Sequence, residues 1–135
     1  MTARQARPFV RLDVWLAANP KLLQVPPLAR WLYVVSITVA GRSLSDGRVR
    51  RSVVTVEAEV PDKTAAPLLK VGLWHEPGHG CPRCPQLEPG WVVVHDYIVW
   101  QQTRAEVEER SAARSAAGRK GALVRWGQGQ QEGDS

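Results

Sequence analysis

Apolar residues recur at spacings of three and four along residues 28–40, and this pattern predicts an α-helix. The recurring positions are Leu28, Trp31, Leu32, Val35 and Val39. The Pro26-Pro27 pair suits the first turn of such a helix, and Gly41 is suited to end it. We therefore expect a central core helix over residues 28–40, in which Trp31 and Tyr33 are packing residues.

A turn at Ser45-Asp46-Gly47 separates this helix from the next segment. Residues 48–51 predict a short strand or the lead-in to a helix. Ser52 can then cap a second helix over residues 53–60. Four consecutive β-branched or hydroxyl-bearing residues at its start, 53–56, weaken its helix propensity.

A third helix is predicted over residues 63–71. Asp62 is suited to cap its start, and Gly72 is suited to end it. Pro67 lies inside this range and lacks the backbone N–H that a helix interior needs, so we expect it to shorten or kink the helix.

Two runs rich in aromatic and β-branched residues, 73–76 and 91–97, predict the strands of a hairpin. The segment that joins them is crowded with Gly, Pro, His and Cys, and it holds the only two cysteines of the chain. This composition offers little apolar surface to bury, so we expect a bound metal ion to order the loop.

The spacing His75-x3-His79-x-Cys81-x2-Cys84 predicts a structural zinc site. Zinc favours four N or S ligands in a tetrahedron, and a Cys-x2-Cys turn supplies two thiolates. His95 is the alternative histidine ligand, but the expected hairpin register places it opposite Gly72 and away from the loop. The predicted ligands are therefore His75, His79, Cys81 and Cys84.

Two other interpretations of the Cys81 and Cys84 pair compete with the zinc site. A redox dithiol of this spacing starts a helix, which Pro82 and Pro85 prevent here. Two cysteines without a ligand are the remaining alternative, because isolated Cys-x2-Cys pairs do occur.

The chain after the hairpin predicts a projecting helix over residues 103–126. Thr103 and Glu106 form a capping box, and the apolar stripe that follows is thin and mostly alanine. The predicted organisation is a flexible basic arm (1–8), a folded domain (9–102), this helix, and a disordered tail (127–135).

The net charge of +5 favours a polyanionic partner. No signal peptide is recognised, and the longest apolar run, residues 31–40, is too short to cross a membrane. We therefore expect a cytoplasmic protein with no membrane partner, whose cysteines stay reduced.

The predicted order of helices and strands is that of an α+β winged helix-turn-helix, with a zinc knuckle inserted in the wing and an extended C-terminal helix. In such folds the helix before the wing meets the DNA major groove, and the wing touches the backbone. The predicted DNA-binding residues are Arg42, Arg48, Arg50, Arg51, Lys63, Thr64, Lys70, Arg83, Arg119 and Lys120. For the arginines at 48–51, a solvated surface is an equally good interpretation.

Several segments together resemble small winged-helix proteins of actinobacteriophages and their prophages, described as helix-turn-helix or replication-initiator-like DNA-binding proteins. The segments are Asp46-Gly47-Arg48-Val49, Gly72-Leu73-Trp74-His75-Glu76, Cys81-Pro82-Arg83-Cys84-Pro85, Val94-His95-Asp96-Tyr97 and the run 102–108. The resemblance covers residues 9–126. It implies a DNA-binding domain in the cytoplasm of a bacterial host.

The leading expectation is a zinc-stabilised DNA-binding protein that acts in phage replication initiation or transcriptional control. Its expected partners are double-stranded DNA and a replication or transcription protein. The alternative is an adaptor that binds a protein partner, or a second copy of itself, through the C-terminal helix. We do not expect an enzyme, because four protein ligands leave zinc no open position for water.

Overall fold

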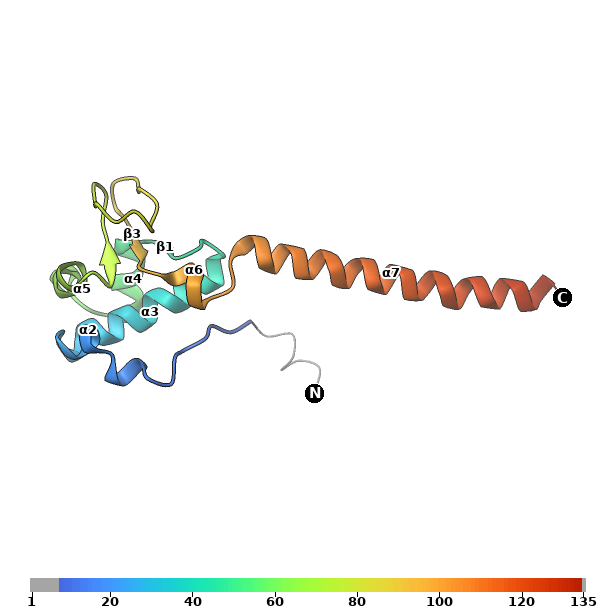
Figure 1. Ribbon diagram of the computed structural model, residues 1–135, viewed down its shortest axis with the longest axis horizontal. Coiled ribbons are helices and arrows are strands. Elements are labelled where there is room, and N and C mark those ends of the chain that lie inside the picture. The colour runs from blue at the N-terminus through green and yellow to red at the C-terminus, as the bar shows by residue number, and fades with distance from the viewer. Residues whose placement is uncertain (1–7, 135) are drawn as a thin grey trace. The chain divides into compact units, whose positions relative to one another are not determined.

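The computed structural model describes the backbone of residues 8–134 and the side chains of residues 8–124. Residues 1–7 of the predicted basic arm lie outside the described residues. The chain divides into two units, one up to Thr103 and one from Arg104 onward. The first unit contains η1 (Leu16–Ala18), α2 (Pro20–Leu23), α3 (Pro27–Ser43), β1 (Arg48–Arg50), α4 (Arg51–Ala58), η2 (Asp62–Ala65), α5 (Ala66–Val71), β2 (Trp74–His75), β3 (Trp91–Val94) and α6 (Tyr97–Trp100), and the second is α7 (Arg104–Asp134) (Figure 1).

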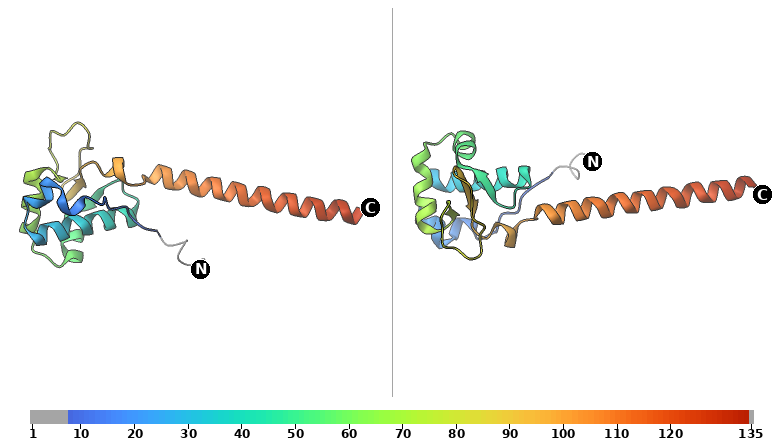
Figure 2. Two further views of the ribbon diagram at one scale, coloured as in Figure 1. Left: turned by 60° about the horizontal axis from the view of Figure 1, so that its bottom comes forward. Right: turned by 90° about the horizontal axis from the view of Figure 1, so that it is seen from above.

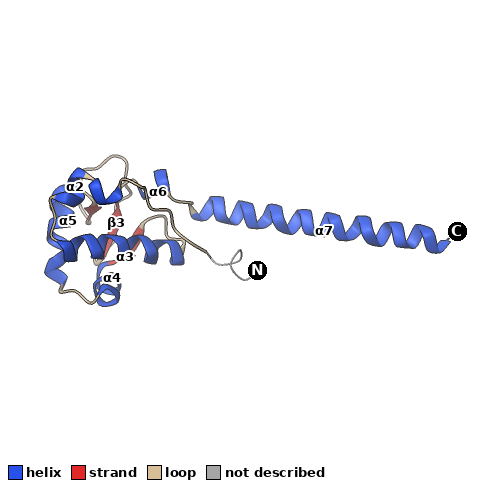
Figure 3. Ribbon diagram, turned by 90° about the horizontal axis from the view of Figure 1, so that it is seen from below, coloured by secondary structure: helices blue, strands red, loops and turns tan. Residues whose placement is uncertain are grey.

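The three strands form one antiparallel sheet in the order β1-β3-β2, so the fold is α+β. Val49 pairs with Val92, and Trp74 pairs with Val94. These four side chains are buried on the sheet face that packs on the helices, and α3 lies against β1 and β3 (Figure 3). The loop between β2 and β3 extends away from the helices (Figure 2, left).

The central helix is confirmed, and three of the five apolar positions that predicted it, Leu32, Val35 and Val39, are buried, whereas the other two are not. Leu28 and Trp31 are 58% and 52% exposed, whereas Leu32, Ala29 and Ala40 are fully buried. The small residues Ala29 and Ala40 complete the buried face of α3 and let the helix lie close to its neighbours. The tryptophan in the core is instead Trp74, which is 0% exposed.

The ends of the helices differ from the predictions by a few residues. Gly41 is inside α3 rather than at its end, and Leu44 ends the helix in a left-handed conformation. The side chain of Val10 packs so close to Gly41 that an added Cβ would lie 2.3 Å from it. Glycine is therefore needed at position 41 for close approach and not as a cap.

The second helix begins at Arg51, directly after β1, and no side chain caps it, so the predicted cap at Ser52 is wrong. The third predicted helix is divided, as Pro67 led us to expect. A 3₁₀ turn, η2, comes first, and Pro67 lies in the first turn of α5, where no N–H is required. Gly72 ends α5 with φ 79, as predicted.

Helix α7 extends to Asp134, beyond the predicted end at residue 126 and through the predicted tail. Its described side chains are exposed at nearly every position from 104 to 124. Among the described residues, no helix combines the length and the apolar character that crossing a membrane requires.

Candidate metal centre

Four half-buried side chains meet beneath the β2–β3 loop: His75, Cys81, Cys84 and His95. One ligand atom from each lies within 4.8 Å of all the others. The Nδ1 atom of His95 is 2.9 Å from His75 Nε2, 3.4 Å from Cys84 Sγ and 3.7 Å from Cys81 Sγ. Tetrahedral ligands at zinc-like bond lengths are separated by about 3.3–3.8 Å. The two distances from His95 to the sulfurs fall in this range, and the distance from His95 to His75 is shorter.

The strand register explains why His95 belongs to this group. His75 pairs with Val93, and the backbone N–H of His95 donates to the carbonyl of Leu73 at 2.9 Å. His95 is thus two residues beyond Val93 and shares the sheet face of His75, as a diagonal neighbour. The prediction that His95 lies opposite Gly72 and away from the loop is wrong by one residue, and in a strand one residue reverses the face.

His79 is not part of the cluster, although its spacing made it a predicted ligand. Its Nδ1 accepts a hydrogen bond from the backbone N–H of Cys81 at 3.1 Å, so its Nε2 carries the proton and donates to the carbonyl of Pro85 at 2.7 Å. The ring also stacks on His75, with centroids 4.9 Å apart. Both nitrogens are therefore used to hold the loop that presents the cysteines.

Asp96 contacts His95 and Cys84 of the cluster, a role that the sequence did not predict. Its Oδ2 lies 3.3 Å from His95 Nε2, and its backbone N–H forms a hydrogen bond with the Cys84 sulfur. Its Oδ1 forms an ion pair of 2.9 Å with Arg83, one of the two residues between the cysteines. A carboxylate behind a histidine orients the ring toward a metal and raises its basicity.

The electrostatics of the cluster suit a cation. Burial lowers the pKa of His75 and of His95, which keeps both rings in the neutral form that binds metals. Burial also raises the pKa of the Cys84 thiol. A bound cation would reverse that shift by stabilising the thiolate, so metal binding and loss of the thiol proton are coupled.

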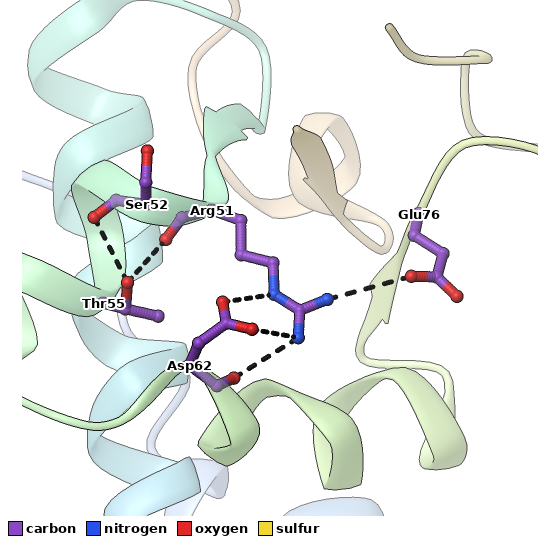
Figure 4. A network of polar contacts seen from close by, with 5 residues as sticks. All are labelled: Arg51, Ser52, Thr55, Asp62 and Glu76. Carbon is purple, nitrogen blue, oxygen red and sulfur yellow. Dashed lines mark hydrogen bonds and ion pairs between the residues drawn. The ribbon is translucent and has the colours of Figure 1, made fainter. Parts of the chain in front are cut away.

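Three of the predicted DNA-binding arginines are engaged in ion pairs. Arg42 pairs with Glu57 at 2.6 Å, and Arg83 pairs with Asp96. Arg51 binds Asp62 through Nε at 2.8 Å and Nη2 at 3.0 Å, and its Nη1 lies 3.8 Å from Glu76 (Figure 4). These ion pairs link α3 to α4, α4 to η2, and the loop that carries the two cysteines to Asp96.

The other predicted DNA-binding residues are arranged differently. Arg48, Arg50, Lys63 and Lys70 are exposed, and Thr64 is half-buried. Arg48 and Arg50 lie on the outer face of β1, where Arg50 stands 5.4 Å above the ring of Trp91. Arg119 and Lys120 are exposed on α7.

Replacing Arg51 with alanine is expected to lower the free energy of unfolding by about 1 kcal/mol. The bidentate pair with Asp62 joins α4 to η2, and the Arg51 side chain is only 26% exposed. Arg42→Ala, which removes an arginine whose side chain is 62% exposed, is the control and should cost less. Urea unfolding measures both free energies. Equal losses would mean that the pair with Asp62 stabilises the fold no more than the pair with Glu57.

No protein-family model, curated protein or solved structure matches this chain.

Proposed function

We propose that this chain is a winged-helix DNA-binding protein whose wing is held by a structural zinc ion. The observation that carries the proposal is the order α3-β1-α4-α5-β2-β3 with the strand arrangement β1-β3-β2. Three helices, a short strand after the first of them, and a terminal hairpin are the elements of a winged helix. In that arrangement α5 is the helix that meets the major groove.

Two thiolates and two imidazoles are the donor set that zinc prefers over harder cations. With His75, Cys81, Cys84 and His95 as ligands, all four tetrahedral positions are filled by the protein. Such a closed site has no room for a reactive water, which supports a structural and non-enzymatic role. The zinc would fix a loop that carries few apolar residues of its own.

Lys63 and Lys70 supply the proposed phosphate contacts from η2 and α5, and Arg48 and Arg50 supply a second group from β1. All four side chains are exposed. Contacts of this kind fix position on DNA without reading its sequence. Arg42, Arg51 and Arg83 are left out, because DNA would have to compete with their carboxylate partners.

The phage or prophage setting, in the cytoplasm of a bacterial host, rests on the resemblance of the sequence alone. A role in replication initiation or transcriptional control, with the corresponding protein partner, belongs to the same proposal. DNA binding is the part of it that can be tested first.

We expect duplex DNA affinity to fall by several orders of magnitude between about 50 and 200 mM salt. Lys63→Ala with Lys70→Ala should reduce the slope of log affinity against log salt by about two, because each lost phosphate contact removes about one. Fluorescence anisotropy with a labelled duplex measures both quantities.

The matched control for this experiment is Arg11→Ala with Arg42→Ala, which removes the same charge from exposed positions elsewhere in the first unit. It should leave the slope nearly unchanged. If wild type binds and the two double variants behave alike, α5 is not the DNA-contacting helix.

A protein-interaction adaptor is the second candidate function, favoured by an exposed apolar surface. Trp15 and Trp100 are 74% and 62% exposed, and both line a cleft of ≈ 320 Å³ between residues 11–20, α3 and α6. An apolar interface hardly responds to salt. Self-association that persists at high salt in analytical ultracentrifugation, without DNA binding, would favour this function.

A further inference from the structure

Helix α7 separates its charges along the chain. Its first turns hold Glu106, Glu108 and Glu109, and no Asp or Glu follows until Glu132. The stretch between them carries five cations: Arg110, Arg114, Arg119, Lys120 and Arg125. Arg114, Arg119 and Lys120 therefore have no acid three or four residues away, where a helix would allow an ion pair.

Two of these cations share a face with two glycines. At 3.6 residues per turn, Arg110, Arg114, Gly118 and Gly121 lie within about 80° of one another around the helix axis. A Cβ added at either glycine would have no neighbour within 4 Å. Packing within the described residues thus gives no reason for glycine at two positions where it weakens the helix.

We propose that this arginine–glycine face, residues 110, 114, 118 and 121, lies along the phosphate backbone of duplex DNA. The inference rests on the proposed DNA-binding function and names a second contact element for it. Charge complementarity identifies the partner, because phosphates are the dense anions that arginines attract. Arg114 carries most of this argument, since Arg110 lies four residues after Glu106 and its contact with phosphate would compete with that carboxylate. The glycines remove the side chains that would keep the helix backbone away from the phosphates.

Arg119 and Lys120, which the sequence predicted as DNA contacts, point elsewhere by the same geometry. They lie about 120° to 140° from the middle of the arginine–glycine face. They provide a control with the same charge change on other sides of the same helix.

The test compares two double variants of the full chain in duplex DNA binding across a salt series. Arg110→Ala with Arg114→Ala should weaken binding roughly tenfold or more and lower the salt slope by about two. Arg119→Ala with Lys120→Ala should weaken binding less than roughly threefold. Equal effects would show that only total charge matters and would overturn the assignment of a face.

A second experiment tests the close approach. Gly118→Ala with Gly121→Ala places methyl groups in open space in the free protein and favours the helix. Helix content by circular dichroism should hold or rise while DNA affinity falls roughly fivefold, because the added groups keep the phosphates away. Unchanged or improved affinity would overturn the role given to the glycines.

The Lys63 and Lys70 variant separates this inference from the function on which it rests. If that variant loses binding while the Arg110 and Arg114 variant does not, the winged-helix proposal stands and the α7 inference fails. If only the α7 variant loses binding, the contact assigned to α5 fails. A wild-type chain that does not bind DNA overturns both. Self-association that depends on Arg110 and Arg114 overturns the α7 inference alone, because the face would then contact a second copy of the chain.

Discussion

Trp74→Ala is expected to lower the free energy of unfolding by about 3–5 kcal/mol, the largest stability effect of the changes considered for this chain. The Trp74 side chain is 0% exposed and is the largest that is fully buried. It reaches from β2 into the core, where its Nε1 donates to Ser36 Oγ on α3 at 3.0 Å. Removing the indole leaves a cavity between sheet and helix and takes a hydrogen-bond partner from a buried hydroxyl.

Trp31→Ala is the matched control for this prediction. Trp31 is 52% exposed, and its Nε1 donates to the carbonyl of Ala58 at 3.2 Å. Half of its surface stays in water, so we expect a loss of only about 1–2 kcal/mol. Urea unfolding followed by circular dichroism compares the two without relying on tryptophan fluorescence. Equal losses would mean that Trp74 is not the anchor between sheet and α3.

His95→Ala is expected to abolish high-affinity zinc binding, whereas His79→Ala should retain it. The ring of His95 lies within reach of both sulfurs, and Asp96 orients it. Changes behind a ligand usually cost 10–100-fold in metal affinity, so loss of the ligand itself should cost at least about 100-fold. Elemental analysis and competition with a chromophoric chelator measure stoichiometry and affinity.

The two histidine variants also separate the ligand set of the structure from the set that the spacing predicted. His79→Ala removes the hydrogen bonds to Cys81 and Pro85, so it should loosen the loop and raise the rate of zinc release while one zinc per chain remains. If His79→Ala loses zinc and His95→Ala keeps it, the ligands are His75, His79, Cys81 and Cys84 after all. A wild-type chain without zinc and with two reactive thiols would remove the metal from the proposal.

The sequence by itself determined the local features of this protein. The spacing of apolar residues located α3, Pro67 divided the third helix, and Gly72 ended it, because each acts through the backbone of its immediate neighbours. The hairpin and the Cys81-x2-Cys84 turn were also evident, since a tight turn brings two cysteines together whatever surrounds them. In the same way, the sequence placed His75 at the end of β2, beside the loop.

Only the tertiary structure decided which residues meet across distance. His95 joins the cluster because the β2–β3 register sets the face on which it lies just after β3, and a shift of one residue would reverse that face. His79 stays out because the loop turns its ring nitrogens to the Cys81 N–H and the Pro85 carbonyl. Trp74 fills the core and Trp31 does not, because burial depends on how α3 packs on the sheet and not on side-chain size. The ion pairs of Arg51 and Arg83 also depend on the tertiary structure, because their carboxylate partners, Asp62 and Asp96, come from segments that folding brings beside them.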